Sequence, residues 1–128
     1  MALYAIGDLH LCLGAPKPMD IFGPVWRNYL ENIVESWNSL VEDEDVVILA
    51  GDYSWAMKLE DAVEDFTFLT KLKGKKILIR GNHDYWWKSI SKLRTELPES
   101  IYPLQNDAIK IGNYIIAGTR GWVVAEKN

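Results

Sequence analysis

Short runs dominated by apolar residues recur along the chain, at positions 3–6, 46–50 and 76–80. The first run does not alternate between apolar and polar residues, so it predicts a strand that is buried on both faces. The second run is wholly apolar and rich in β-branched residues, which favour strands. The third run begins shortly after Gly74 and ends at Arg80. Each run therefore predicts one strand.

Between and after these runs, apolar residues recur every three or four positions, which is the spacing of one helical face. Pro24 suits the first turn of the first helix, Gly74 suits the C-terminal cap of the second, and Pro98 ends the third. Three helices that face a core are therefore predicted. Their apolar stripes are Val25, Tyr29, Ile33, Trp37, Leu40 and Val41, then Leu59, Ala62, Val63, Phe66, Leu69 and Leu72, then Trp86, Ile90, Leu93 and Leu97.

The alternation of strands and helices indicates a parallel sheet with right-handed crossovers. Residues 101–104 predict a further short strand, which Pro103 confines to an edge of the sheet. Residues 107–111 and 114–118 flank Gly112-Asn113, a pair that fits a two-residue hairpin turn. Residues 13–24 are rich in proline and glycine and predict a loop. The expected fold class is therefore α/β, with a parallel β-α-β sheet that passes into an antiparallel hairpin.

The composition is that of an ordinary globular protein. The 128 residues are 48% hydrophobic and 25% charged, which predicts a single domain over residues 1–128. Acidic residues outnumber basic ones by 18 to 14, so no nucleic-acid surface is indicated. Cys12 is the only cysteine, which excludes an intramolecular disulfide and suits a reducing compartment. No apolar run approaches the roughly 20 residues that span a bilayer, and we expect a cytoplasmic protein without a membrane contact.

Two other features receive structural interpretations. The acidic run at positions 42–45 lies at the C-terminal end of the first predicted helix, where the helix dipole disfavours negative charge. We therefore expect it to be solvated in the connection that follows. Four of the tryptophans are interpreted as packing residues. These are Trp26, Trp37, Trp55 and Trp122.

Chemically versatile residues follow each of the three predicted strands. Asp8 and His10 follow the first, Gly51-Asp52 the second, and the sequence Gly81-Asn82-His83-Asp84 the third. Ligands of open parallel sheets collect outside the carboxyl ends of the strands. A single Asp after a strand is most often a turn residue, but three such motifs at matching strand ends predict one shared site.

Carboxylate, imidazole and amide groups form a ligand set that suits manganese, iron or zinc. Asp52 can bridge two ions, with Asp8 and His10 on one side and Asn82 on the other. Two divalent ions against two carboxylates leave a positive field, which favours an anionic phosphate ester and a metal-bound hydroxide. His83 could then protonate the leaving oxygen, with Asp84 fixing the tautomer of its ring.

The three motifs, in this order, resemble those of the calcineurin-like metallophosphoesterases. The neighbouring residues 53–56, 85–87 and 118–122 are similar to a bacterial branch of predicted phosphohydrolases. The resemblance implies the first half of a four-layer α/β/β/α sandwich and a centre of two divalent ions. It implies the metal ligands Asp8, His10, Asp52 and Asn82, with Asp52 shared, and the catalytic pair His83 and Asp84.

Family members continue with a second sheet and with further histidine ligands, whereas His10 and His83 are the only histidines here. We therefore expect a fragment or a naturally shortened family member, in which water or another chain supplies the remaining ligands. The alternative is an inactive chain that binds a partner or assembles with itself. Its partner, a second copy or a missing C-terminal half, would cover the open apolar face and add strands to the hairpin that begins at Asp107.

Overall fold

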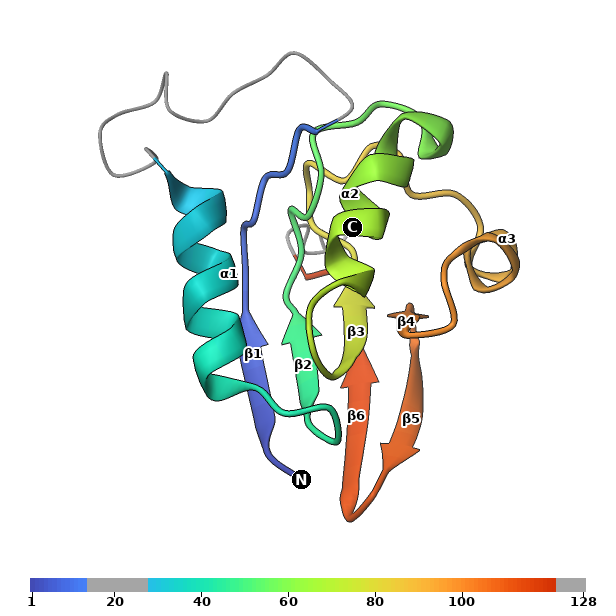
Figure 1. Ribbon diagram of the computed structural model, residues 1–128. Coiled ribbons are helices and arrows are strands. Elements are labelled where there is room, and N and C mark those ends of the chain that lie inside the picture. Colours follow the sequence, from blue (N-terminus) through green and yellow to red (C-terminus); the bar gives the residue numbers. More distant parts are fainter. Residues whose placement is uncertain (14–27, 122–128) are drawn as a thin grey trace.

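The computed structural model describes residues 1–13 and 28–121, and its centre is a parallel sheet (Figure 1). The strands are β1 (Leu3–Ile6), β2 (Val46–Leu49), β3 (Lys75–Ile79) and β4 (Ile101–Leu104), in the order β1-β2-β3-β4. All three neighbouring pairs are parallel, with Leu3 beside Val46, Val46 beside Lys75, and Lys76 beside Ile101. The predicted parallel sheet, with its proline-containing edge strand, is confirmed.

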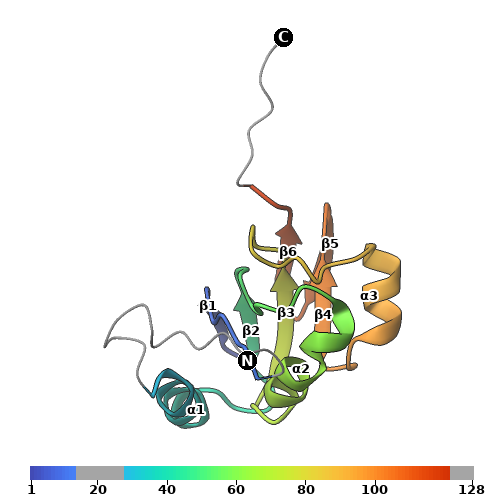
Figure 2. The same cartoon turned by 90° about the horizontal axis from the view of Figure 1, so that it is seen from above.

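Helices connect these strands and cover one face of the sheet. They are α1 (Tyr29–Leu40), a 3-10 turn η3 (Leu59–Ala62) that leads into α2 (Val63–Thr70), and α3 (Ile90–Glu96). Figure 2 shows α1 and α2 on the side of the sheet opposite the C-terminal hairpin, with α3 beside β4. The larger core cluster joins buried helix residues such as Trp37, Phe66 and Leu93 to Val47 and Leu78 of the sheet.

The C-terminal hairpin forms a second sheet. It consists of β5 (Asp107–Ile111) and β6 (Tyr114–Gly118), which pair antiparallel around Gly112 and Asn113 as the sequence predicts. Ile116 packs against Val46, Ile77 and Leu104 in a smaller core cluster. The hairpin therefore covers the face of the parallel sheet that the helices leave open, giving helix, sheet and sheet layers.

The prediction that the first strand is buried on both faces is wrong. β1 is the edge of the described sheet, and its residues alternate between exposed and half-buried. The smaller core cluster draws on β2, β3 and β4 but not on β1. Leu3 is therefore 37% exposed although it lies in an apolar run.

The acidic run is solvated only in part. Residues 42–44 are exposed, as expected, but Asp45 is buried. Its carboxylate accepts hydrogen bonds from the backbone N–H of Ala2 at 2.6 Å and of Glu42 at 2.8 Å. Asp45 therefore ties the connection after α1 to the start of β1, a contact that a reading of local charge does not reveal.

The predicted stripes identify the helices, with three differences. Leu40 is 60% exposed at the C-terminal end of α1, although its stripe predicts that it faces the core. Val63 is 56% exposed because the turn before α2 is 3-10 rather than α-helical, which changes the face that each residue presents. Trp86 is fully buried but precedes α3. Outside the described residues lie positions 14–24 of the loop predicted over 13–24, the predicted helix start at Val25, and Trp26 and Trp122. None of the described helices has the length and apolar character needed to cross a membrane.

Candidate metal centre

The loops that follow β1 and β2 run side by side beyond the sheet (Figure 1). Backbone N–H groups of Asp8 and His10 donate to the carbonyls of Gly51 and Asp52, both at 3.0 Å. Leu11 N–H donates to the Tyr53 carbonyl, and Leu11 accepts from Trp55 N–H, both at 2.9 Å. The parallel pairing thus continues past the strand ends and fixes the first two motifs against each other.

This pairing brings Asp8, His10 and Asp52 together. One ligand atom from each lies within 4.8 Å of the others. The Nε2 atom of His10 is 3.9 Å from an oxygen of Asp8 and 3.9 Å from an oxygen of Asp52. These separations are too long for hydrogen bonds, and they resemble those between ligands that share one ion at bonds of about 2.0–2.2 Å. The donor set therefore fits a divalent cation.

The third motif meets Asp52 from the other side. The backbone N–H of His83 donates to Asp52 Oδ1 at 2.8 Å, and His83 Nδ1 is 2.9 Å from Asp52 Oδ2. The nearer end of the Asn82 amide is 3.2 Å from both carboxylate oxygens. A nitrogen at that end donates to Asp52, whereas an oxygen there would need a cation between the two groups. Asp52 is thus the common neighbour of Asp8, His10, Asn82 and His83.

The backbone at the three clustered residues is unusual. Asp8, His10 and Asp52 have φ values of 58°, 46° and 50°, in the left-handed region that costs a non-glycine residue of the order of 1–3 kcal/mol. The backbone pairing of the two loops holds these conformations. Such residues turn their side chains to directions that an extended continuation of the strand would not allow.

Close packing of two glycines joins the second and third motifs. A Cβ atom on Gly51 would lie 2.7 Å from the Cα of Gly81, and a Cβ on Gly81 would overlap the backbone nitrogen and the carboxylate of Asp52. Gly51 also has a φ of 107°, which favours glycine. Only glycine at both positions lets the two loops approach closely enough for Asp52 to meet His83.

Asp84 lies beneath the third motif rather than beside the imidazole. It is 1% exposed. One oxygen accepts from the N–H groups of Tyr53 at 2.7 Å and Ser54 at 3.2 Å and from Trp86 Nε1 at 3.1 Å, and the other accepts from Gly81 N–H at 2.7 Å. Among the described residues no hydrogen bond joins Asp84 to the His83 ring. The expected contact between the two is therefore replaced by one between His83 and Asp52.

Burial and hydrogen bonding act in opposite directions on the two central carboxylates. Burial raises the pKa of Asp52, but hydrogen bonds from the His83 side chain and backbone, with the charges of His83 and His10, lower it by more. The net pKa of Asp52 is below its ordinary value. Burial dominates at Asp84 and raises its pKa, against the hydrogen bonds that it accepts. Asp52 is therefore kept ionised, as a metal ligand must be.

One residue at the centre was missed by the sequence reading. Trp55 was expected to be a packing residue, and Trp37 is one, at 5% exposed. The Trp55 ring instead stacks on His10, with centroids 4.9 Å apart, and lies 5.3 Å from the His83 ring. No periodic pattern marks this role, because Trp55 lies in a loop whose neighbours are set by the backbone pairing.

A buried carboxylate on α2 supports the same loops. Asp65 is 1% exposed and accepts hydrogen bonds from Ser54 Oγ at 2.5 Å and from Leu13 N–H at 3.0 Å. Burial raises its pKa, and these bonds oppose the change. The Tyr53 hydroxyl donates a hydrogen bond to the backbone carbonyl of Asp65. The start of α2 thus holds both loops from outside the centre.

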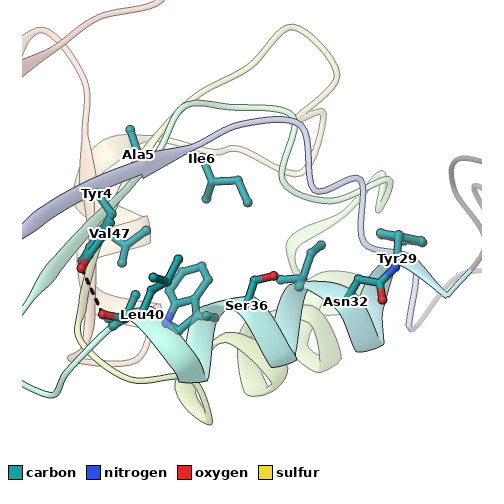
Figure 3. A pocket seen from close by; sticks show the side chains of 11 residues that line it. Tyr4, Ala5, Ile6, Tyr29, Asn32, Ser36, Leu40 and Val47 are labelled. Carbon is teal, nitrogen blue, oxygen red and sulfur yellow. Dashed lines mark hydrogen bonds between the residues drawn. The ribbon is translucent and has the colours of Figure 1, made fainter.

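A groove of about 390 Å³ lies between α1 and the edge strand β1 (Figure 3). At one end the Tyr4 hydroxyl donates to the Leu40 carbonyl at 3.0 Å. Tyr29 lines the groove and donates to the backbone carbonyl of His10 at 3.1 Å. The described residues that line this groove do not include the clustered Asp8, His10 or Asp52, so the groove and the centre are separate features.

Comparisons with known proteins bear on the family and the fold. The family described as calcineurin-like phosphoesterase matches residues 1–126. A crystal structure of a protein of unknown function from Aquifex aeolicus is similar at 24% identity and a TM-score of 0.56, which supports the fold. The alignment covers 90% of this chain and 58% of that one, so this chain spans little more than half the length of its structural relative. No curated protein matches.

Proposed function

The chain belongs to the calcineurin-like phosphoesterase family, and from this membership we propose that its strand-end centre supports metal-dependent hydrolysis of a phosphate ester. The observation that carries the proposal is the convergence of Asp8, His10 and Asp52 within 4.8 Å. These residues come from two separate loops and adopt costly backbone conformations to meet. An ordinary turn has no need of such an arrangement.

The donor chemistry indicates how metal would be held. Asp8, His10 and Asp52 would bind one divalent ion, and Asp52 with Asn82 would bind a second. Oxygen and imidazole donors suit manganese, iron or zinc. Such ions lower the pKa of bound water and stabilise negative charge on a phosphoryl group. Both the number of ions, two, and their identity as manganese, iron or zinc are proposed here.

The protein's own groups would orient the ester and handle the proton of the leaving group. His83 is 38% exposed in its side chain and lies beside Asp52 through Nδ1. That contact uses Nδ1, so a proton for the leaving oxygen would come from Nε2 of the doubly protonated ring. Asp84 would act through the backbone, since it holds Gly81 and the residues after Asp52 in place.

The test is hydrolysis of aryl phosphate and phosphodiester substrates with added manganese, using Asp52→Asn. Metal catalysis contributes several kcal/mol, and each 1.36 kcal/mol is a factor of ten. We therefore expect the variant to lose at least about 100-fold in rate. Asp61→Asn is a matched control, because Asp61 is exposed on η3 and outside the centre. It should keep the full rate.

Absence of turnover with any divalent ion would reject the enzyme for this chain, as would an unchanged rate in Asp52→Asn. The competing candidate is a binding or self-assembling module. Its supporting observation is the outer face of the hairpin, where Ile115 is 75% exposed. Light scattering separates the two: an inactive chain that forms a defined oligomer favours the module, whereas an active monomer favours the enzyme.

A further inference from the structure

The backbone of Trp55 is held rigidly at the rim of the centre. Its N–H donates to the Leu11 carbonyl at 2.9 Å, within the isolated parallel bridge between Leu11 and Ser54. Ser54 is in turn hydrogen-bonded to buried Asp65, and its hydroxyl accepts from Ala56 N–H at 3.1 Å. Hydrogen bonds therefore hold the residues on both sides of Trp55, and they define the backbone position from which its ring projects.

Among the described residues, the Trp55 ring contacts two imidazoles, one stacked and one tilted. It stacks on His10 at 4.9 Å with an interplanar angle of 27°, and it lies 5.3 Å from His83 at 50°. The two imidazoles are themselves 6.1 Å apart. In the described part of the chain, the ring contacts of Trp55 are both to histidine, and the sequence has only these two histidines.

Neighbouring groups fix the plane of a histidine ring, and His83 already has one such neighbour in the Nδ1 contact with Asp52. The χ2 torsion of histidine is broad and roughly two-fold, so the rotamer alone does not fix the plane of the imidazole. A flat ring stacked on one face removes most of that freedom. Hydrogen-bonded groups that orient metal-binding histidines typically change metal affinity by 10–100-fold when they are removed, and a stacked ring that fixes the same orientation should act on the same scale.

We propose that Trp55 is a positioning residue, which holds the imidazole planes of His10 and His83 in the orientation that the centre uses. The role deepens the proposed function and rests on it for its catalytic consequence. The geometry itself is independent of activity. Trp55 lies outside the hydrophobic core, whereas Trp37 and Trp86 are 5% and 0% exposed and belong to it.

The first test is histidine NMR on the metal-free protein, which contains two imidazoles in total. Trp55→Leu keeps an apolar side chain but removes the flat face, and Trp55→Phe restores a flat ring. We expect the His10 ring protons to lie upfield in the parent protein, to move toward the position of free imidazole in Trp55→Leu, and to return most of the way in Trp55→Phe. Trp37→Phe is the matched control and should leave both histidines unchanged.

The second test is calorimetric titration of the metal-free proteins with Zn²⁺. Trp55→Leu should bind about 10–100-fold more weakly than the parent, and Trp55→Phe should lie within a few-fold of it. With saturating metal, Trp55→Leu should lower kcat more than it raises KM, because His83 acts on the leaving group. A purely structural effect would instead lower the unfolding midpoint, as Trp37→Phe should, without changing zinc affinity.

Failure of this inference is distinguishable from failure of the proposed function. Histidine signals and zinc affinity that stay unchanged in Trp55→Leu would overturn the positioning role, even if the parent protein is an active hydrolase. An inactive parent whose zinc affinity still falls in Trp55→Leu and recovers in Trp55→Phe would reject the hydrolase and retain the positioning role. Circular dichroism on each variant confirms that the comparison is between folded proteins.

Discussion

Asp84 illustrates what a single side chain does at the residue scale. A carboxylate can accept about four hydrogen bonds, and Asp84 accepts four, from three backbone N–H groups and the Trp86 indole. Its donors come from the loop after β2 and the loop after β3. One buried side chain therefore connects two motifs that are about thirty residues apart in sequence, which explains why it contacts backbone rather than the neighbouring imidazole.

Asp84→Asn tests this structural role. The amide oxygen of Asn can still accept from Tyr53, Ser54 and Trp86. Its NH₂ group then faces the Gly81 N–H, so that N–H loses its acceptor. An unsatisfied buried donor costs about 1–3 kcal/mol, and we expect the free energy of unfolding in urea to fall by that amount. Asp8→Asn is the matched control because the Asp8 side chain is 70% exposed. Without metal it should change stability by less than about 0.5 kcal/mol. An equal loss in both variants would contradict the prediction.

The sequence identifies the residue types of the centre but not all of their contacts. Asp8, His10 and Asp52 were predicted to meet because parallel strands end at one edge of a sheet, and they do meet. The partner of His83 could not be predicted, since both Asp52 and Asp84 are within reach of a turn histidine. Which one bonds to the ring depends on donors of Tyr53 and Ser54 that occupy Asp84.

At the scale of elements, the close approach of the loops after β2 and β3 decides the geometry of the centre. The approach depends on Gly51 and Gly81, whose backbones leave no room for a side chain between them. Asp52 directly follows Gly51 in the sequence, and its carboxylate accepts a hydrogen bond from the His83 N–H. A widening of this gap would separate Asp52 from the third motif.

Gly81→Ala should therefore disturb the loops more than a glycine substitution at another strand end. The added Cβ overlaps the backbone and carboxylate of Asp52, and overpacking of this kind costs typically about 1–3 kcal/mol. We expect lower stability in urea and weaker Mn²⁺ binding by calorimetry. Gly7→Ala is the control, because its Cβ would meet Ala50 at an ordinary 3.6 Å. Wild-type manganese binding in Gly81→Ala would show that the close approach is not needed.

Local patterns predict most elements but not their neighbours. The apolar runs identify β1, β2 and β3 because each is a short, mainly apolar run that ends at turn residues, although only β2 and β3 are largely buried. The Gly-Asn pair gives the hairpin because it suits the turn. The start of the second helical segment is 3-10, however, and the burial of Asp45 depends on the distant Ala2. Such features follow from packing between elements.

At the scale of the whole molecule, the order of the strands determines which strands are covered by neighbouring strands and layers and which are exposed. β2 and β3 have a neighbouring strand on both sides and helices and hairpin on their two faces. β1 has one neighbour in the described sheet, and its apolar sequence does not reveal this. Within residues 1–13 and 28–121, β5 and β6 pair with no strand but each other, and their outer face includes Ile115, which is 75% exposed.

This difference predicts a gradient of local stability that amide hydrogen exchange can measure. Regions with few buried contacts open at lower free energies than core strands. We expect the slowest exchange in β2 and β3, where Val47, Ile77 and Leu78 are at most 2% exposed. Exchange should be intermediate in β1 and β4 and fastest among the strands in β5 and β6. The two edge strands serve as internal controls, since they share the parallel sheet but have one strand neighbour each. Hairpin amides as well protected as those of β3 would instead mean that both sheets open as one unit, with the contact of Ile116 on Ile77 and Leu104 strong enough to couple them.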